Sequence, residues 1–130
     1  MLTFNSESNY HLIGCGIDGE TIARFAKLEK EDRPFPMVFS SDEIEHIKSL
    51  ANQALGFCAS FCCKEAAYKA LGQPLNFTEC ELFFNPHKTL QRPKLSLPGT
   101  DNPTINDCTV RFLRPQPEEM VAVVHLYGRR

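Results

Sequence analysis

The feature that most constrains the fold is the segment from Gln53 to Leu71, which predicts one long helix. Lys69 lies in its last turn, Gly72 follows directly and Pro74 lies beyond, an order typical of a helix C-terminus. A helix turns about 100° per residue, so residues three and four positions apart share a face. On this wheel the apolar residues gather in one arc, which consists of Ala54, Phe57, Cys58, Phe61 and Cys62.

Two charged residues of the helix, Glu65 and Lys69, fall within that apolar arc. Gln53, Ser60 and Lys64 fall on the opposite side. A charged pair that faces a core is costly unless it is paired or takes part in chemistry. The alternative is an ordinary surface pair, because Glu placed four residues before Lys stabilises a solvated helix by about 0.2–0.5 kcal/mol. The position on the wheel favours a functional pair.

The N-terminal part of the chain predicts a strand and then a helix. The strand is expected from Tyr10 to Ile17, where Gly14 and Gly16 permit another backbone to approach closely. Asp18 follows the strand, and the helix is expected from Glu20 to Leu28.

Another helix is predicted to begin after Ser40. Ser40 can cap the helix, and Glu43 stands three residues further on, which is the capping-box pattern. Phe39 and Ile44 have the spacing of a hydrophobic staple across the same helix start. This helix is expected to run to about Leu50.

The C-terminal part of the chain is rich in β-forming residues. Its last two segments are separated by two prolines, at 115 and 117, and predict a hairpin with a wide loop. Early helices and late strands favour a single α+β domain over residues 1–130, with the helices packed on a largely antiparallel sheet. The expected strands are Glu79 to Asn85, Lys94 to Leu97 (before a Pro98-Gly99 turn), Cys108 to Leu113 and Met120 to Tyr127.

Composition excludes several classes of function. The 130 residues suit one domain with a modest core, and a net charge of −2 gives no overall basic field for nucleic acid. There is no run of about 20 apolar residues to span a membrane, and no signal peptide is visible. The six cysteines form no C-x-x-C pair, so we expect reduced thiols in a cytoplasmic protein rather than disulfides or a zinc site.

Asp18 is the second candidate for a functional role, because it lies where the expected strand meets the expected helix. Its alternative role is to cap that helix. If Asp18 and Glu65 converge, the two carboxylates suit Mg²⁺, which takes one or two carboxylates, keeps waters and binds substrate phosphates. Lys69 would then stabilise charge on a phosphate. Sequence spacing alone leaves this convergence open.

Three segments of the chain carry a family resemblance. Residues 14–25 (GCGIDGETIARF), 38–44 (VFSSDEI) and 59–72 (ASFCCKEAAYKALG) resemble, in order and spacing, the motifs of the holo-acyl-carrier-protein synthase group of 4′-phosphopantetheinyl transferases. Residues 91–99 are similar to a later segment of that family. The resemblance implies Mg²⁺-dependent transfer of 4′-phosphopantetheine from coenzyme A to a serine of an apo acyl carrier protein, with release of 3′,5′-ADP. It also implies a homotrimer with coenzyme A at the subunit interfaces.

The resemblance implies roles for five residues. Asp18 and Glu65 match the metal carboxylates, and Glu65 is also the candidate base for the serine proton. Lys69 matches the catalytic lysine beside the phosphates, and Lys64 matches a second lysine that meets coenzyme A. Arg24 matches an arginine that receives the acidic carrier protein. Helix spacing places Lys27 next to Arg24, which would extend a basic patch for the carrier; the alternative is a solvated helix face.

The chain also departs from the family pattern. Its late stretch, residues 109–124, lacks the family's serine and histidine, so Arg111 or Arg114 either replaces those phosphate contacts or is simply solvated. Ser60 replaces an arginine, and Cys62 and Cys63 occupy positions that hold alanines in the family. These departures keep two alternatives open: a relative that binds carrier protein or coenzyme A without transfer, and an unrelated Mg²⁺-phosphate enzyme on the same scaffold.

Overall fold

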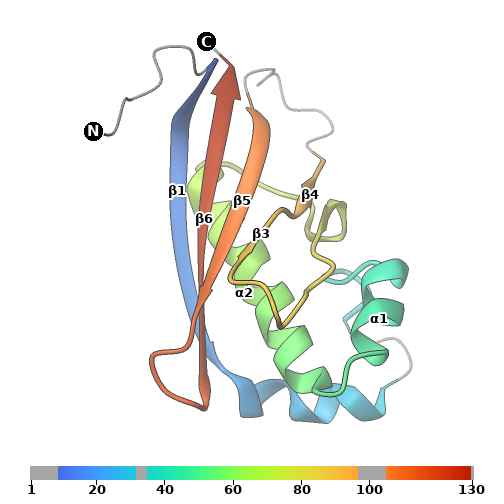
Figure 1. Cartoon of the computed structure of the whole chain (residues 1–130). Coiled ribbons are helices and arrows are strands. Elements are labelled where there is room, and N and C mark those ends of the chain that lie inside the picture. The colour runs from blue at the N-terminus through green and yellow to red at the C-terminus, as the bar shows by residue number, and fades with distance from the viewer. Residues whose placement is uncertain (1–8, 32–34, 97–104, 130) are drawn as a thin grey trace.

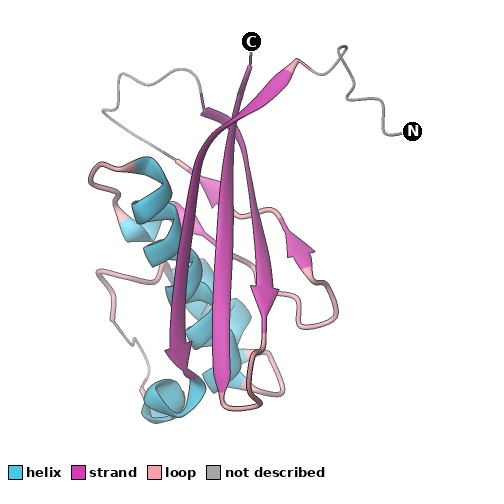
Figure 2. Cartoon of the chain, turned by 90° about the vertical axis from the view of Figure 1, so that its left-hand side faces the viewer, coloured by secondary structure: helices cyan, strands magenta, loops and turns pink. Residues whose placement is uncertain are grey.

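An antiparallel four-stranded sheet with helices on one face forms the domain, as Figures 1 and 2 show. The computed structural model describes residues 9–31, 35–96 and 105–129. The strand order is β1-β6-β5-β3, and β2 and β4 form a separate two-stranded sheet. The α+β prediction is therefore confirmed. The elements are β1 (Tyr10–Thr21), the 3₁₀ helix η1 (Ile22–Lys30), α1 (Ser41–Lys48), α2 (Gln53–Leu71), the 3₁₀ turn η2 (Phe77–Glu79), β2 (Cys80–Glu81), β3 (Leu90–Gln91), β4 (Lys94–Leu95), β5 (Ile105–Leu113) and β6 (Glu119–Arg129).

Helix α2 lies along the inner face of the sheet and begins and ends where the sequence predicts (Figure 1). Asn52 caps its start, since the side-chain oxygen accepts a hydrogen bond from the backbone N–H of Leu55 at 3.0 Å. Gly72 ends it with φ of 68°, a left-handed conformation that glycine adopts without a Cβ clash.

The predicted solvent-facing side of α2 is wrong. Ser60 and Lys64 are wholly buried, whereas Lys69 is exposed. The helix is covered by the sheet on one side and by α1 and the segment before β2 on the other. A wheel drawn from one helix cannot show that Lys64 forms a buried ion pair with Glu43, which belongs to α1.

Strand β1 is longer than predicted and replaces the start of the expected helix. It pairs with β6 through Asp18 opposite Ala122 and ends at Thr21 opposite Glu119. Asp18 is therefore a strand residue, and its alternative role as a helix cap is wrong. The following helix is a 3₁₀ helix, and Thr21 at its start makes no side-chain capping bond.

Two glycines of β1, Gly14 and Gly16, allow the strand and α2 to touch backbone to backbone, as the sequence predicts. A Cβ at Gly14 would collide with the carbonyl oxygen of Ala70, and one at Gly16 with that of Ala66. The amide nitrogen of Ala70 would lie only 2.7 Å from a Cβ at Gly16. This contact fixes the distance between β1 and α2, the two elements that carry the candidate site.

The remaining elements follow the sequence in part. Helix α1 has the predicted capping box, with Ser40 Oγ accepting from Glu43 N at 3.1 Å and Glu43 Oε1 accepting from Ser40 N at 3.0 Å. The late hairpin is confirmed and is longer than predicted. The expected strand Glu79 to Asn85 is reduced to β2, because it pairs only with the short β4. Leu97 and the expected Pro98-Gly99 turn lie outside the described residues.

Among the described residues, no helix covers the outer face of the sheet (Figure 2). Side chains of β6 alternate, with even-numbered residues from Met120 to Leu126 buried beneath α2 and odd-numbered ones half-buried on the outer face. Ile17 and Leu12 of β1 lie there with 57% and 54% of their surfaces exposed. Along the described part of the chain, no helix is long and apolar enough to cross a membrane.

Candidate functional site

The candidate site forms where β1 crosses α2. Side chains alternate along a strand, so Asp18 lies on the same face of β1 as Gly16 and points toward α2. The ammonium of Lys69 lies 3.1 Å from Asp18 Oδ1 and donates a second hydrogen bond to the carbonyl oxygen of Ile17, also at 3.1 Å. The close glycine contact therefore brings the predicted aspartate and lysine together.

Glu65 lies one helical turn before Lys69 and belongs to the same cluster. Partial burial raises the pKa of the Glu65 carboxyl, and the neighbouring Asp18 carboxylate raises this pKa further. Lys69 opposes both effects. The Asp18 carboxylate disfavours the ionised form of Glu65, an effect that a cation bound near both groups would relieve.

The site residues fit a divalent cation. Asp18 Oδ2 is buried and has no hydrogen-bond partner, although Oδ1 of the same group is paired with Lys69. A buried carboxylate oxygen without a partner is costly, and a cation shared with Glu65 would satisfy it. The described residues hold no group of three or more metal-binding side chains. A site with two carboxylates suits Mg²⁺, whose other ligands would be waters and phosphate oxygens.

Lys64 lies in the core and not at this site. Its side chain is fully buried, and its ammonium donates to Glu43 Oε1 at 2.8 Å, to Phe77 O at 2.6 Å and to Cys80 O. An ammonium has three N–H donors, so all of its donors are used inside the protein. The prediction that Lys64 contacts coenzyme A finds no support in this placement.

Glu20 is a site residue that sequence reasoning missed. Its carboxylate raises the pKa of Glu65 and pairs with Arg24 at 2.5 Å. Glu20 lies two residues after Asp18 in β1, so the two side chains share a face of the strand. The signal was present in the alternation D-x-E, but it was hidden because the strand was predicted to end at Ile17.

Arg24 and Lys27 line a groove with an apolar floor between η1 and α2. The groove holds about 240 Å³. The guanidinium of Arg24 lies 5.6 Å from the ring centroid of Phe61 and 5.7 Å from that of Phe25, within cation–π range. The sequence indicated the two basic residues but not the floor. The lining residues are Arg24, Phe25, Lys27, Phe35, Val38 and Phe61.

The two arginines of the late hairpin lie away from the carboxylates. Arg114 donates to the backbone oxygen of Pro117 within its own turn. Arg111 is exposed and alternates with the buried Val110 and Phe112, so it faces the outer side of the sheet. Within this chain, neither arginine reaches the Asp18 and Glu65 cluster.

The sequence matches the model of a known family. A model of the 4′-phosphopantetheinyl transferase superfamily matches residues 14–113, which cover most of β1, both α-helices and β5. The chain therefore belongs to the 4′-phosphopantetheinyl transferase superfamily. A search of curated proteins gives no match.

Solved structures of holo-acyl-carrier-protein synthases share this fold at low sequence identity. The enzyme from Plasmodium yoelii is 19% identical, with a TM-score of 0.68. The alignment covers 95% of this chain and 100% of that one. The enzyme from Thermotoga maritima is 23% identical with a TM-score of 0.64, covering 92% of this chain. The present chain spans 66% of the Thermotoga maritima chain.

A third neighbour was solved with a ligand. The holo-acyl-carrier-protein synthase from Bacillus anthracis, in complex with coenzyme A (3′,5′-ADP), is 21% identical with a TM-score of 0.63, covering 90% of this chain and 97% of that one. At these identities the likeness establishes the fold.

Proposed function

We propose that this protein transfers 4′-phosphopantetheine from coenzyme A to a serine of an apo acyl carrier protein and releases 3′,5′-ADP, with Mg²⁺ as cofactor. One observation carries the proposal: the buried, unpartnered Asp18 oxygen beside Glu65 and Lys69. Membership of the superfamily supports the reaction class. The coenzyme A complex of the Bacillus anthracis neighbour supports the choice of donor.

The chain's own groups suit the steps of this reaction. Phosphoryl transfer depends on positioning and charge neutralisation more than on covalent chemistry by the protein. Bound Mg²⁺ would neutralise charge on the pyrophosphate of coenzyme A. Lys69 is half exposed, so its ammonium can turn from Asp18 toward a phosphate. Glu65, with its raised pKa, is the candidate base that accepts the proton of the attacking serine hydroxyl.

The test is a transfer assay read by mass. The protein is incubated with coenzyme A, Mg²⁺ and several apo carrier proteins, of which carriers of fatty acid biosynthesis are the first choice. We expect the carrier to gain one 4′-phosphopantetheine group and expect a chelator to prevent this gain. Tight carrier binding without any adduct would instead identify a relative that binds without transfer.

Free thiols at all six cysteines are in keeping with action in the cytoplasm.

We propose that the groove beside Arg24 and Lys27 receives the carrier protein. Its basic rim would attract acidic side chains, and its apolar floor would bury an apolar one. We further propose a homotrimer that uses the uncovered outer face of the sheet, since exposed Leu12 and Ile17 there are apolar. Coenzyme A would then lie where subunits meet.

Charge reversal in the groove should weaken carrier binding. Lys27→Glu is expected to raise the KM for the carrier about tenfold, with less change in kcat, because the partner is acidic and Lys27 lines the groove. Lys30→Glu changes the net charge equally at an exposed position of the same helix outside the groove. Steady-state kinetics with varied carrier concentration separate the two variants. Equal KM increases for both would assign the effect to overall charge.

A further inference from the structure

Apolar packing makes up most of the surroundings of helix α2, although the candidate site depends on how the helix is rotated. Most of the residues of α2 are small or apolar and are buried; Ala59, Cys62 and Ala66, for example, have no exposed surface. Apolar contacts are not directional, so they resist rotation or sliding of such a helix weakly. The glycine contact with β1 sets how closely the helix approaches on one side. Contacts on the other side of α2 must fix how the helix is rotated about its own axis.

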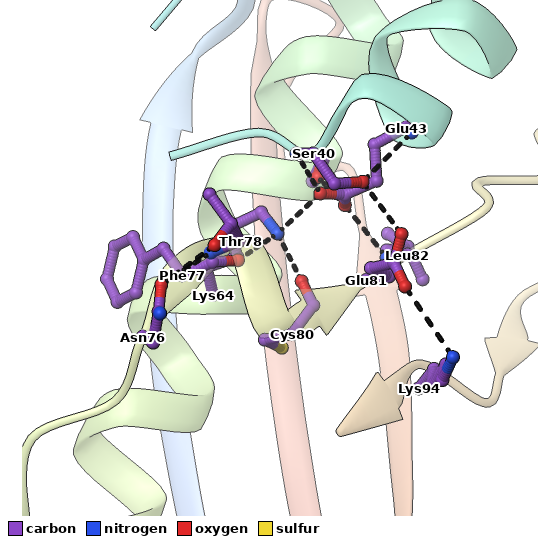
Figure 3. A network of polar contacts seen from close by, with 11 residues as sticks. Ser40, Glu43, Lys64, Asn76, Phe77, Thr78, Cys80, Glu81, Leu82 and Lys94 are labelled. Atoms are coloured by element: carbon purple, nitrogen blue, oxygen red, sulfur yellow. Dashed lines mark hydrogen bonds and ion pairs between the residues drawn. The ribbon is translucent and has the colours of Figure 1, made fainter. Parts of the chain in front are cut away.

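A buried polar network supplies that second constraint (Figure 3). Lys64 projects from the middle of α2 and binds Glu43 Oε1 of α1 at 2.8 Å. It also binds the backbone oxygens of Phe77 in η2 and of Cys80 at the start of β2. Residues of α1, η2 and β2 therefore hold one side chain of α2.

Glu43 completes the network from the side of α1. Its Oε2 accepts from Ser60 Oγ at 3.0 Å and from the backbone N–H of Leu82 at 2.9 Å. Ser60 lies one helical turn before Lys64, so α2 is held at two points along its length. Ser40 N donates to Glu43 Oε1, and Ser40 Oγ donates to Glu81 at 2.7 Å, which ties the network to β2.

We propose that Glu43 and Lys64 are positioning residues that fix the rotation of α2, so that Glu65 and Lys69 meet Asp18. Lys64 is the residue directly before Glu65, and neighbouring residues on a helix point about 100° apart. Locking Lys64 therefore sets the direction of Glu65. A fully satisfied buried network specifies one arrangement in a way that apolar packing does not. This inference rests on the proposed metal site and deepens it.

The test measures metal affinity rather than turnover. Mn²⁺ binding is followed by electron paramagnetic resonance without coenzyme A or carrier. The double variant Glu43→Gln/Lys64→Met removes both charges and keeps one side-chain oxygen for Ser60 and Leu82. We expect the folded double variant to bind Mn²⁺ at least fivefold more weakly than the wild type and to lose kcat more than KM for the carrier.

Lys48→Met is the matched control. Lys48 also donates through its ammonium to several backbone oxygens, including Glu29 O at 2.9 Å, but these bonds tie α1 to η1 and the residue that follows it, and none goes to α2. We expect Lys48→Met to keep the Mn²⁺ affinity of the wild type even where it lowers the melting temperature. Equal losses of affinity in the control and the double variant would overturn the proposal.

Further outcomes separate this inference from the proposed function. Normal Mn²⁺ affinity in the folded double variant would overturn the positioning role, as would a wild type that binds no Mn²⁺. Weakened Mn²⁺ binding alongside a wild type without transferase activity would support positioning and reject the proposed reaction. If the double variant does not fold, Ser60→Ala removes one contact and leaves the ion pair. We expect about a twofold weaker affinity from it, and an unchanged affinity would contradict the proposal.

Discussion

Replacing Glu65 with glutamine is expected to lower kcat for phosphopantetheine transfer at least about 100-fold. Groups that only orient a metal ligand already cost about 10- to 100-fold when removed, and Glu65 is proposed as a ligand itself. Glutamine also cannot accept the serine proton. Transfer rates and the Mg²⁺ concentration for half-maximal rate measure the effect, with Glu45→Gln at an exposed position of α1 as the control. Unchanged transfer by Glu65→Gln would remove Glu65 from the site.

Glu65→Gln should be more stable than the wild type when no metal is present. The pKa of Glu65 is raised in the fold, by burial first and by Asp18 second, so its ionised form is disfavoured there. Wild-type stability therefore falls as pH rises from the ordinary glutamate range through this raised pKa. Glutamine does not ionise, so its advantage is present at neutral pH and vanishes in acid. Thermal melts with a chelator across pH test this sign.

In excess Mg²⁺, the wild type should be more stable than Glu65→Gln. A cation that binds the folded wild type adds stability that grows with the logarithm of its concentration over its dissociation constant, and Glu65→Gln loses most of this gain. The wild type is therefore expected to melt higher than the variant in excess Mg²⁺. Melting temperatures that respond identically to Mg²⁺ would contradict a shared carboxylate site.

Gly16→Ala is expected to destabilise the protein by about 3 kcal/mol or more. Its Cβ would collide with backbone atoms of Ala66 and Ala70, and backbone in a packed helix cannot move aside without shifting α2. The melting temperature should fall by more than about 10 °C. Protein that remains folded should also lose Mg²⁺ affinity, because α2 would move away from Asp18.

Gly19→Ala is the matched control on the same strand. A Cβ there would lie 3.2 Å from a side-chain methyl group of Val121, which can adjust. We expect its free energy of unfolding to stay within about 1 kcal/mol of the wild type. Denaturant melts of both variants make the comparison. Equal losses at the two positions would mean that the backbone contact with α2 is not what Gly16 provides.

The sequence predicted those parts that local chemistry decides. The C-terminal end of α2 follows from Lys69, Gly72 and Pro74, and the capping box of α1 follows from Ser40 and Glu43. Each of these signals acts within a few residues, so no knowledge of distant contacts was needed. The sequence left open whether Asp18 and Glu65 converge, and the structure pairs Asp18 with Lys69.

The errors arose where distant residues decide the outcome. The strand β1 continues past Ile17 because β6 pairs with it, a partner about a hundred positions away in the chain. Lys64 looked solvent-facing because its partner Glu43 lies on another helix. Burial of a lysine depends on whether a carboxylate and free carbonyls surround it, and a helix wheel contains none of that information.

The residues of the candidate site and the outward residues of the β5–β6 hairpin lie in separate parts of the fold. Asp18, Glu65 and Lys69 come from β1 and α2, while the β5–β6 hairpin presents inward residues to α2 and outward residues to the uncovered face. Outward positions of the hairpin are therefore free to diverge without disturbing the carboxylates. This separation allows the late segment to depart from the family pattern while the proposed metal carboxylates are kept.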